Sequence, residues 1–299
     1  MNAVDGTVAV VTGATGGMGR VIALRLAQRG MHVVTIARDP RRAEDLRAEA
    51  ERATGTLEVI AGDLSHREGV TAAADAIRAR HGGIALLVNN AGAHYAQRRL
   101  SRDGIEMHVA LDYLAAYGLT VLLAPELRRG RARVVNVASD TLRDTRQVKL
   151  WGKPRPATLD IQDLHDLTRV NGPRGYVPFE AYARAKLLTV TAGYALARAL
   201  DPEVTVNAVH PGIVATDIVD DLVPAALRPF GALIRRAMLT PEQGAAAALR
   251  LATDPALRGV TGRYFVRETD TATPPVSYDD DVQAGLRATT DRFFGVGAV

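Results

Sequence analysis

Residues 7–19, with the sequence TVAVVTGATGGMG, decide the fold that this chain is predicted to adopt. The apolar, β-branched run at 7–11 is typical of a buried parallel strand, and residues 20–29 have helical periodicity. The glycines therefore form a strand-to-helix turn, where the backbone can approach a pyrophosphate and the helix N-terminus favours its negative charge. The expected cofactor contacts in this turn are Gly13, Thr15, Gly17, Met18 and Gly19.

The glycine spacing, G-x-x-x-G-x-G, differs from the G-x-G-x-x-G pattern of many dinucleotide sites. Such a turn can also be purely structural, but its position between a strand and a helix favours nucleotide binding. Further apolar runs alternate with helical patterns along the chain. Strands are expected at 8–11, 32–37, 57–61, 85–88, 133–137, 204–209 and 263–266, and helices at 20–29, 41–53, 69–80, 104–124, 182–200 and 241–252. This alternation predicts an α/β fold with a doubly wound parallel sheet of about seven strands, with helices on both faces and ligands at the carboxyl ends of the strands.

Length and composition narrow the class of protein. The 299 residues, 47% of them hydrophobic, could form one large α/β domain or two small ones, and the absence of a linker-like tract favours a single domain over 1–299. Zero cysteines exclude disulfides and thiol nucleophiles. We expect a soluble, cytoplasmic protein without a membrane anchor, because the sequence shows no signal peptide and its uncharged runs are shorter than the roughly 20 residues that span a bilayer. The net charge of +4 comes with only 5% aromatic residues, so no nucleic-acid partner is expected.

Polar and small residues follow the predicted strands. Arg38 follows the second strand, at the place where a carboxylate would bind the ribose of NAD, and a cation there suits the 2′-phosphate of NADP(H). Asp63 and Leu64 follow the third strand as candidate adenine contacts. The fourth is followed by the stretch NNAG at 89–92, in which Asn90, Ala91 and Gly92 would let a cofactor lie against the backbone. Each of these features taken singly could be turn chemistry, and Arg38 could be a solvated turn residue.

Taken in order, these motifs resemble those of the short-chain dehydrogenase/reductase family. The resemblance rests on the glycine turn, Asp63, residues 89–92, Ser139, Tyr182 with Lys186, and Pro211-Gly212. Within the family, the stretches DGIE at 103–106, RVVNV at 133–137, NAVHPG at 207–212 and GRYF at 262–265 are most similar to the branch of retinol dehydrogenases, WW-domain oxidoreductases and light-dependent protochlorophyllide reductases. The resemblance implies a Rossmann-type domain with NADP(H) as cofactor. It also implies cofactor contacts from Tyr182, Lys186, Pro211, Gly212, Val214 and Thr216.

Tyr182 and Lys186 form the expected proton-transfer pair. Their spacing of four residues places both side chains on one face of a helix. A free tyrosine titrates near pH 10, and a neighbouring ammonium and an oxidised nicotinamide both lower that pKa. Tyr182 would then protonate the alkoxide in reduction, or remove the hydroxyl proton in oxidation, while Ser139 hydrogen-bonds the substrate oxygen. By itself, a pair with this spacing is more often an ordinary surface feature.

Asp112 departs from the family pattern, because the resemblance places an asparagine of that pattern at this position. That asparagine helps to hold a water that links the lysine to solvent. An aspartate keeps the acceptor oxygens, and if ionised it stabilises the Lys186 ammonium but opposes phenolate formation at Tyr182. The substitution is therefore either a functional replacement or a sign of slow, specialised or lost activity.

Two segments are expected to shape the substrate site. One is a long insertion at about 140–178, between Ser139 and Tyr182, which in similar relatives covers a common dimer surface and so favours a monomer over a homo-oligomer. The other is a lid at about 216–240, which could equally be a plain pair of packing helices. His94 and Tyr95 line the pocket or pack beside it. No metal site is expected from the spacing of His, Asp and Glu, and His108 and Asp112 are interpreted as a surface contact.

The sequence thus predicts an NADP(H)-dependent oxidoreductase, of the ketoreductase or alcohol dehydrogenase type. It would transfer a hydride between nicotinamide and a carbonyl or alcohol of an apolar small molecule. One alternative keeps the fold but uses the Tyr-Lys pair for non-redox proton transfer, in a cyclisation or a dehydration. The other is a weakly active NADP(H)-binding sensor or scaffold, for which Asp112 is the support.

Overall fold

The computed structural model describes residues 7–52, 55–146, 152–215 and 238–297. Among these residues, one eight-stranded sheet has the order β3-β2-β1-β4-β5-β6-β7-β8. Its strands are β1 (Val8–Thr12), β2 (His32–Ala37), β3 (Thr56–Ala61), β4 (Leu86–Asn89), β5 (Arg133–Val137), β6 (Thr205–His210), β7 (Arg263–Val266) and β8 (Thr269–Asp270). The strands from β1 to β7 run parallel, and β8 pairs antiparallel with β7.

The predicted doubly wound sheet is confirmed, and each of the seven expected strands agrees with the structure to within one residue at either end. Their continuous apolar runs are a strong signal because parallel strands are buried on both faces. The short strand β8 was not expected, since two exposed polar residues carry no apolar pattern.

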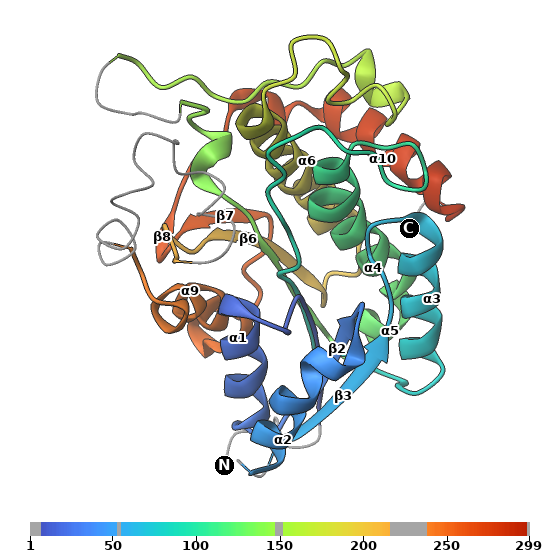
Figure 1. The fold of residues 1–299 in the computed structure, drawn as a ribbon, viewed down its shortest axis with the longest axis vertical. Helices are drawn as coiled ribbons and strands as arrows, with labels where there is room; N and C mark the ends of the chain where they lie inside the picture. Colours follow the sequence, from blue (N-terminus) through green and yellow to red (C-terminus); the bar gives the residue numbers. More distant parts are fainter. Residues whose placement is uncertain (1–6, 53–54, 147–151, 216–237, 298–299) are drawn as a thin grey trace.

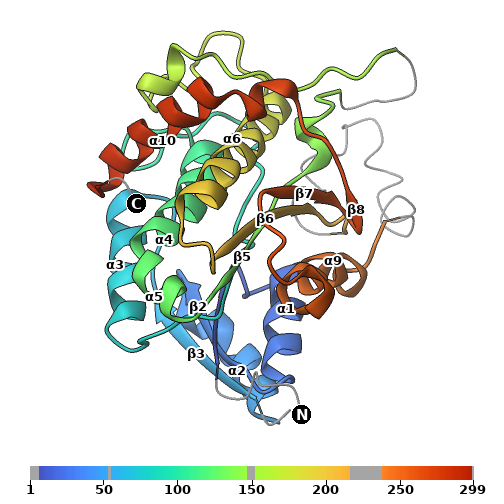
Figure 2. The same cartoon turned by 180° about the vertical axis from the view of Figure 1, so that it is seen from behind.

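Helices cover both faces of the sheet (Figures 1 and 2). One layer contains α1 (Gly17–Ala27), α2 (Glu44–Arg52) and α9 (Pro241–Thr253), and the other contains α3 (Arg67–Arg78), α4 (Ala115–Leu122), α5 (Ala124–Arg129), α6 (Pro178–Ala199) and α10 (Asp280–Phe294). The side chains of β1 alternate between the two cores, because Val10 packs with the α3 and α6 layer while Ala9 and Val11 pack with the α1 and α9 layer.

The helix expected at 104–124 is different in the structure. The helical region begins at Met107, is π-helical over Val109–Leu114, and continues as α4. A π-helical turn holds one extra residue and often occurs at a functional site. Apolar periodicity does not distinguish it from an α-helix, so the sequence could not reveal it.

Helix α10 was not expected either. Asp279 caps its N-terminus by accepting hydrogen bonds from the backbone amides of residues 281 and 282, and Gly295 ends it in a left-handed conformation with φ 67°. Its buried polar side chains hold it against the π-helical stretch and α4. The hydroxyl of Tyr113 lies 2.6 Å from Thr290 Oγ1, and the hydroxyl of Tyr117 donates to Asp291 Oδ1 at 2.6 Å.

The order in which successive strands are added to the sheet reverses at β1, which pairs with β2 on one side and with β4 on the other. Ligands of such sheets bind in the crevice at this switch point. Here the loops after β1 and β4 are tied together, because Thr12 Oγ1 accepts hydrogen bonds from the backbone amides of Asn90 (3.0 Å) and Ala91 (2.8 Å). In return, Asn90 Nδ2 donates to the carbonyl oxygen of Thr12 at 3.0 Å.

Replacing Gly19 by alanine should destabilise the protein. The new Cβ would lie 2.2 Å from the carbonyl oxygen of Gly13, so the turn and the helix would have to move apart. We expect the free energy of unfolding to fall by about 1–3 kcal/mol in urea denaturation without cofactor. Gly82→Ala is the control, because Gly82 is an exposed loop residue at which a Cβ meets no atom within 4 Å, and its effect should stay within about 0.5 kcal/mol. Equal losses in both variants would contradict the close-approach explanation.

Candidate active site

The turn between β1 and α1 fits a pyrophosphate. Gly16 caps α1 without a side-chain hydrogen bond, and the first turn of the helix has no acidic residue. Gly13 has a φ of 68°, which favours glycine, and a Cβ there would lie 2.9 Å from Cα of Ala91. The exposed backbone at Gly16 and Gly17 is therefore open to an anion at the positive end of the helix dipole.

The other predicted cofactor residues that the structure describes lie at the carboxyl ends of the strands. They are Arg38 after β2, Asp63 and Leu64 after β3, Asn90, Ala91 and Gly92 after β4, and Pro211, Gly212 and Val214 after β6. Arg38 is exposed, and none of the described acidic groups lies within ion-pair distance of its guanidinium. The neighbouring Arg41 differs, because it pairs with Asp39 at 2.9 Å. Thr216 lies outside the described residues, as does almost all of the expected lid.

Tyr182 and Lys186 lie on the buried face of α6, with exposed fractions of 6% and 4%. Lys186 Nζ is 5.6 Å from the centre of the Tyr182 ring and donates to the carbonyl oxygen of Val137, the last residue of β5, at 3.1 Å. Ser139 follows β5 and lies beside the Tyr182 side chain, whose pKa it acts to lower. The structure therefore brings together the tyrosine, lysine and serine that the sequence singled out.

Asp112 joins this group from the π-helical stretch. Its Oδ1 lies 2.9 Å from Lys186 Nζ, and the carboxylate is fully buried. Gly92 makes room for the contact, because a Cβ at that position would lie 2.3 Å from Asp112 Oδ1 and 3.1 Å from Lys186 Nζ. The contact favours the charged forms of both side chains, because each charge offsets part of the cost of burying the other. Removing one partner of such a buried pair costs about 3–5 kcal/mol.

Burial and neighbouring charges set the acidity of the group. Burial raises the pKa of Asp112, and the Lys186 ammonium acts against that rise. Burial alone would lower the pKa of Lys186, but the charges of Asp112 and Tyr182 raise it. For Tyr182, burial is the main cause that raises the pKa; Lys186 and the Ser139 hydrogen bond lower it, and the charge of Asp112 raises it further.

A second buried group beside Tyr182 was missed in the sequence. Glu106 and His108 are both 0% exposed, and Glu106 Oε1 lies 2.8 Å from His108 Nδ1. The backbone amide of Tyr95 donates to His108 Nε2 at 2.9 Å, so the ring proton is on Nδ1 and is donated to Glu106. The His108 ring lies 5.9 Å from the Tyr182 ring in an edge-on arrangement. The interpretation of His108 and Asp112 as a surface contact was therefore wrong.

The insertion between Ser139 and Tyr182 is anchored to Glu106. Asn171 Nδ2 donates to Glu106 Oε2 at 2.9 Å, and the Tyr176 hydroxyl donates to Oε1 at 3.0 Å. Burial acts to raise the pKa of Glu106, but the contact with His108 and the hydrogen bond from Asn171 hold it below its ordinary value. His94 packs nearby, with its ring 5.9 Å from that of Tyr182. The described part of the insertion thus lies against the group that surrounds Tyr182.

Comparisons with known proteins agree with this geometry. Residues 7–148 match the family model of short chain dehydrogenases. The chain is 33% identical to polyprenol dehydrogenase from Mus musculus, over 98% of this chain and 85% of that protein. It belongs to the short-chain dehydrogenase/reductase family. Retinol dehydrogenase 14 from Mus musculus is 30% identical, over 97% of this chain and 86% of its own. The similarity to these relatives identifies this short-chain dehydrogenase as an oxidoreductase and confirms the resemblance to the retinol dehydrogenase branch.

Solved structures share the fold of this short-chain dehydrogenase. An uncharacterised protein from Mycobacterium paratuberculosis superimposes with a TM-score of 0.73 at 24% identity, covering 99% of this chain and 97% of its own. An enzyme from Beutenbergia cavernae, assigned as an NAD(P)-dependent gluconate 5-dehydrogenase and crystallised with NADP, has a TM-score of 0.66 at 25% identity, covering 95% and 98%. Among the described helices of the present chain, none combines the length and apolar character that crossing a bilayer requires.

Asp112→Asn should shift the pH dependence of alcohol oxidation. The active form needs deprotonated Tyr182, and the Asp112 charge raises the pKa of this tyrosine. Removing that charge lowers the pKa, so the limb of the pH–rate profile that rises with pH should move to lower pH. Asp291→Asn removes a buried carboxylate next to Tyr117 rather than Tyr182, and should leave the limb in place. An unmoved limb in Asp112→Asn would show that the aspartate serves only to anchor its neighbours.

Proposed function

We propose that this chain is an NADP(H)-dependent oxidoreductase that interconverts a carbonyl and an alcohol on an apolar small molecule. The observation that carries the proposal is the arrangement of the buried Tyr182 and Lys186 with the half-buried Ser139 at the carboxyl ends of the strands, beside the glycine turn. A nicotinamide cofactor, when bound, supplies or accepts the hydride. Membership of the short-chain dehydrogenase/reductase family supports that cofactor.

The proton of the reaction is assigned to Tyr182. In reduction its hydroxyl protonates the oxygen of the substrate, and in oxidation its phenolate removes the hydroxyl proton. Lys186 supplies a positive charge that lowers the tyrosine pKa, while Ser139 orients the substrate oxygen through a hydrogen bond. The Glu106–His108 pair holds the wall of the site beside the Tyr182 ring and excludes water from that side.

The preference for NADP(H) over NAD(H) is assigned to Arg38. Its guanidinium follows β2, where the adenosine ribose lies in dinucleotide folds, and it is exposed without an ion-pair partner among the described residues. A cation at that place favours a 2′-phosphate. The NADP in the Beutenbergia cavernae structure is consistent with this preference.

The substrate class is proposed from the relatives. Polyprenol dehydrogenase and retinol dehydrogenase 14 are named for long, apolar isoprenoid alcohols. Near Tyr182, the partly exposed ring of Tyr95, packed against the buried His108, offers a flat surface for an apolar group. We therefore favour an isoprenoid or similarly apolar primary alcohol, or the corresponding aldehyde.

A second candidate function follows from Asp112. Its buried charge opposes phenolate formation at Tyr182, so the chain could bind NADP(H) and turn over slowly, as a sensor or scaffold. The oxidoreductase remains favoured, because Ser139, Tyr182 and Lys186 are all present and in contact. Measured turnover separates the two functions.

The protein should reduce apolar aldehydes with NADPH. We expect consumption of NADPH with all-trans-retinal or a polyprenal, followed by its absorbance, and slower consumption with small polar aldehydes. Tyr182→Phe is the matched variant, because it removes only the hydroxyl; turnover should fall by roughly a hundredfold or more while NADPH binding stays nearly unchanged. Retained turnover in the variant would assign the proton to another group. NADPH binding without turnover of any aldehyde would favour the sensor.

Arg38→Ala should weaken the binding of NADPH by about tenfold or more and leave NADH binding almost unchanged. The loss reflects one charge-assisted contact to the 2′-phosphate. Calorimetric titration of both cofactors measures it. Arg47→Ala is the control, because it removes an exposed arginine of the same charge from α2, where Arg47 pairs with Glu51. Equal affinity of the wild type for NADPH and NADH would remove the role given to Arg38.

A further inference from the structure

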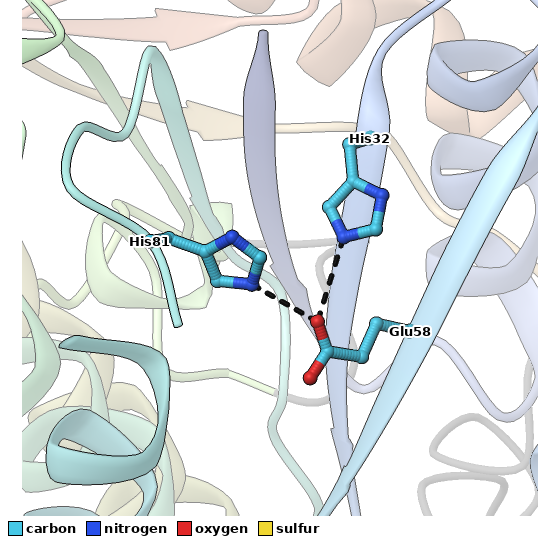
Figure 3. Close-up of side chains that lie close together, drawn as sticks. All are labelled: His32, Glu58 and His81. Atoms are coloured by element: carbon cyan, nitrogen blue, oxygen red, sulfur yellow. Dashed lines mark hydrogen bonds and ion pairs between the residues drawn. The ribbon is translucent and has the colours of Figure 1, made fainter. Parts of the chain in front are cut away.

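Three side chains that the proposed function does not use lie close together near the amino ends of the strands, away from the candidate active site. His32, Glu58 and His81 each direct one atom to a common point (Figure 3). Glu58 Oε2 lies 3.0 Å from His81 Nε2 and 3.5 Å from His32 Nε2, and the three atoms all lie within 4.8 Å of one another. All three residues are partly buried, and the side chain of His81 is only 12% exposed.

The fold itself brings these side chains to one face. His32 begins β2, and its strand neighbour on the same face, Val34, packs in the core under α3. The register pairs Val34 with Glu58, so Glu58 points to that face as well. His81 lies just beyond α3, with its backbone amide bonded to the carbonyl oxygen of Ile77 at 2.9 Å. His32 is the first residue of a parallel strand. The cluster therefore lies toward the amino ends of the strands, whereas Tyr182 lies near their carboxyl ends.

The donor set fits a divalent transition metal ion. Two imidazole nitrogens and one carboxylate oxygen are ligands that zinc prefers, at about 2.0–2.2 Å from the ion. Tetrahedral geometry at those bond lengths separates the donor atoms by about 3.3 Å. The two distances to Glu58 Oε2, 3.0 and 3.5 Å, bracket that separation. The imidazole nitrogens of His32 and His81 lie within 4.8 Å of each other, so enclosing an ion requires them to approach by at most about 1.5 Å.

The surroundings also orient the ligands. His32 Nδ1 lies 2.9 Å from Thr56 Oγ1, so the threonine can hold the proton of the ring on Nδ1 and leave the lone pair of Nε2 directed at the cluster. Arg80 Nε lies 3.2 Å from Glu58 Oε1, which leaves Oε2 for the two histidines. Such outer contacts commonly fix the orientation of metal ligands.

We propose that His32 Nε2, His81 Nε2 and Glu58 Oε2 form a binding site for one divalent transition metal ion of the zinc type. The ion links β2, β3 and the connection after α3, and water completes its coordination on the exposed side. Its role is structural, because it joins three elements at an edge remote from the candidate active site. Mg²⁺ is a poor occupant, since it prefers oxygen ligands.

The test is a titration of Zn²⁺ into the full-length protein, produced without a histidine tag and treated with a chelator. We expect one Zn²⁺ per chain by calorimetry, with a rise in melting temperature because the ion binds the folded state. Mg²⁺ should give neither. His81→Gln and Glu58→Gln should each weaken Zn²⁺ binding by at least about tenfold. His165→Gln is the matched control, because His165 is exposed and lies outside the cluster, and it should bind Zn²⁺ like the wild type.

Circular dichroism shows whether each variant is folded. X-ray absorption of the zinc-loaded wild type gives a measurement that needs no variant, with scattering from two imidazole ligands expected. The proposal is overturned if the wild type binds no Zn²⁺, if the absorption spectrum lacks two imidazoles, or if a folded His81→Gln binds Zn²⁺ as tightly as the wild type. These outcomes are independent of NADPH turnover.

Discussion

The buried ion pair of Lys186 and Asp112 is the interaction on which the candidate active site depends. An ammonium removed from water costs several kcal/mol unless charges and acceptors replace its solvation. Here the replacements come from separate elements: the carboxylate of Asp112 from the π-helical stretch, and the carbonyl oxygen of Val137 from the end of β5. The helix that carries Tyr182 is thereby held to the sheet at the place where a substrate oxygen would bind.

The pair also explains the small residue at position 92. A side chain at Gly92 would occupy the space of the Asp112 carboxylate, so the loop after β4 can pass only without one. The same loop is tied to the glycine turn through Thr12 and Asn90. A continuous set of contacts therefore joins the predicted pyrophosphate position to the ion pair. A substitution in the glycine turn is therefore expected to alter the position of the ion pair, and a substitution in the ion pair to alter the glycine turn.

Much of the fold could be predicted from the sequence, because buried parallel strands leave continuous apolar runs and their turns carry characteristic residues. The meeting of Ser139, Tyr182 and Lys186 could be predicted through spacing and family resemblance. Glu106 and His108 could not, since burial of a charged residue depends on partners such as Asn171, which lies 65 positions away from Glu106. The expectation of no metal site rested on spacing along the chain. Strand register brings His32 and Glu58 to one face, and the end of α3, which covers that face, brings His81 to them.

The π-helical stretch restricts the changes in length that this part of the chain can tolerate. It accommodates an extra residue within the helix, and each residue added or removed rotates the following side chains by about 100° around the helix axis. The inward direction of Asp112 is therefore set by the number of residues in Val109–Leu114 as well as by their identity. Loss of a single residue there would turn the carboxylate away from Lys186 without altering either charge. In this segment, an insertion or deletion is a more severe change than most substitutions.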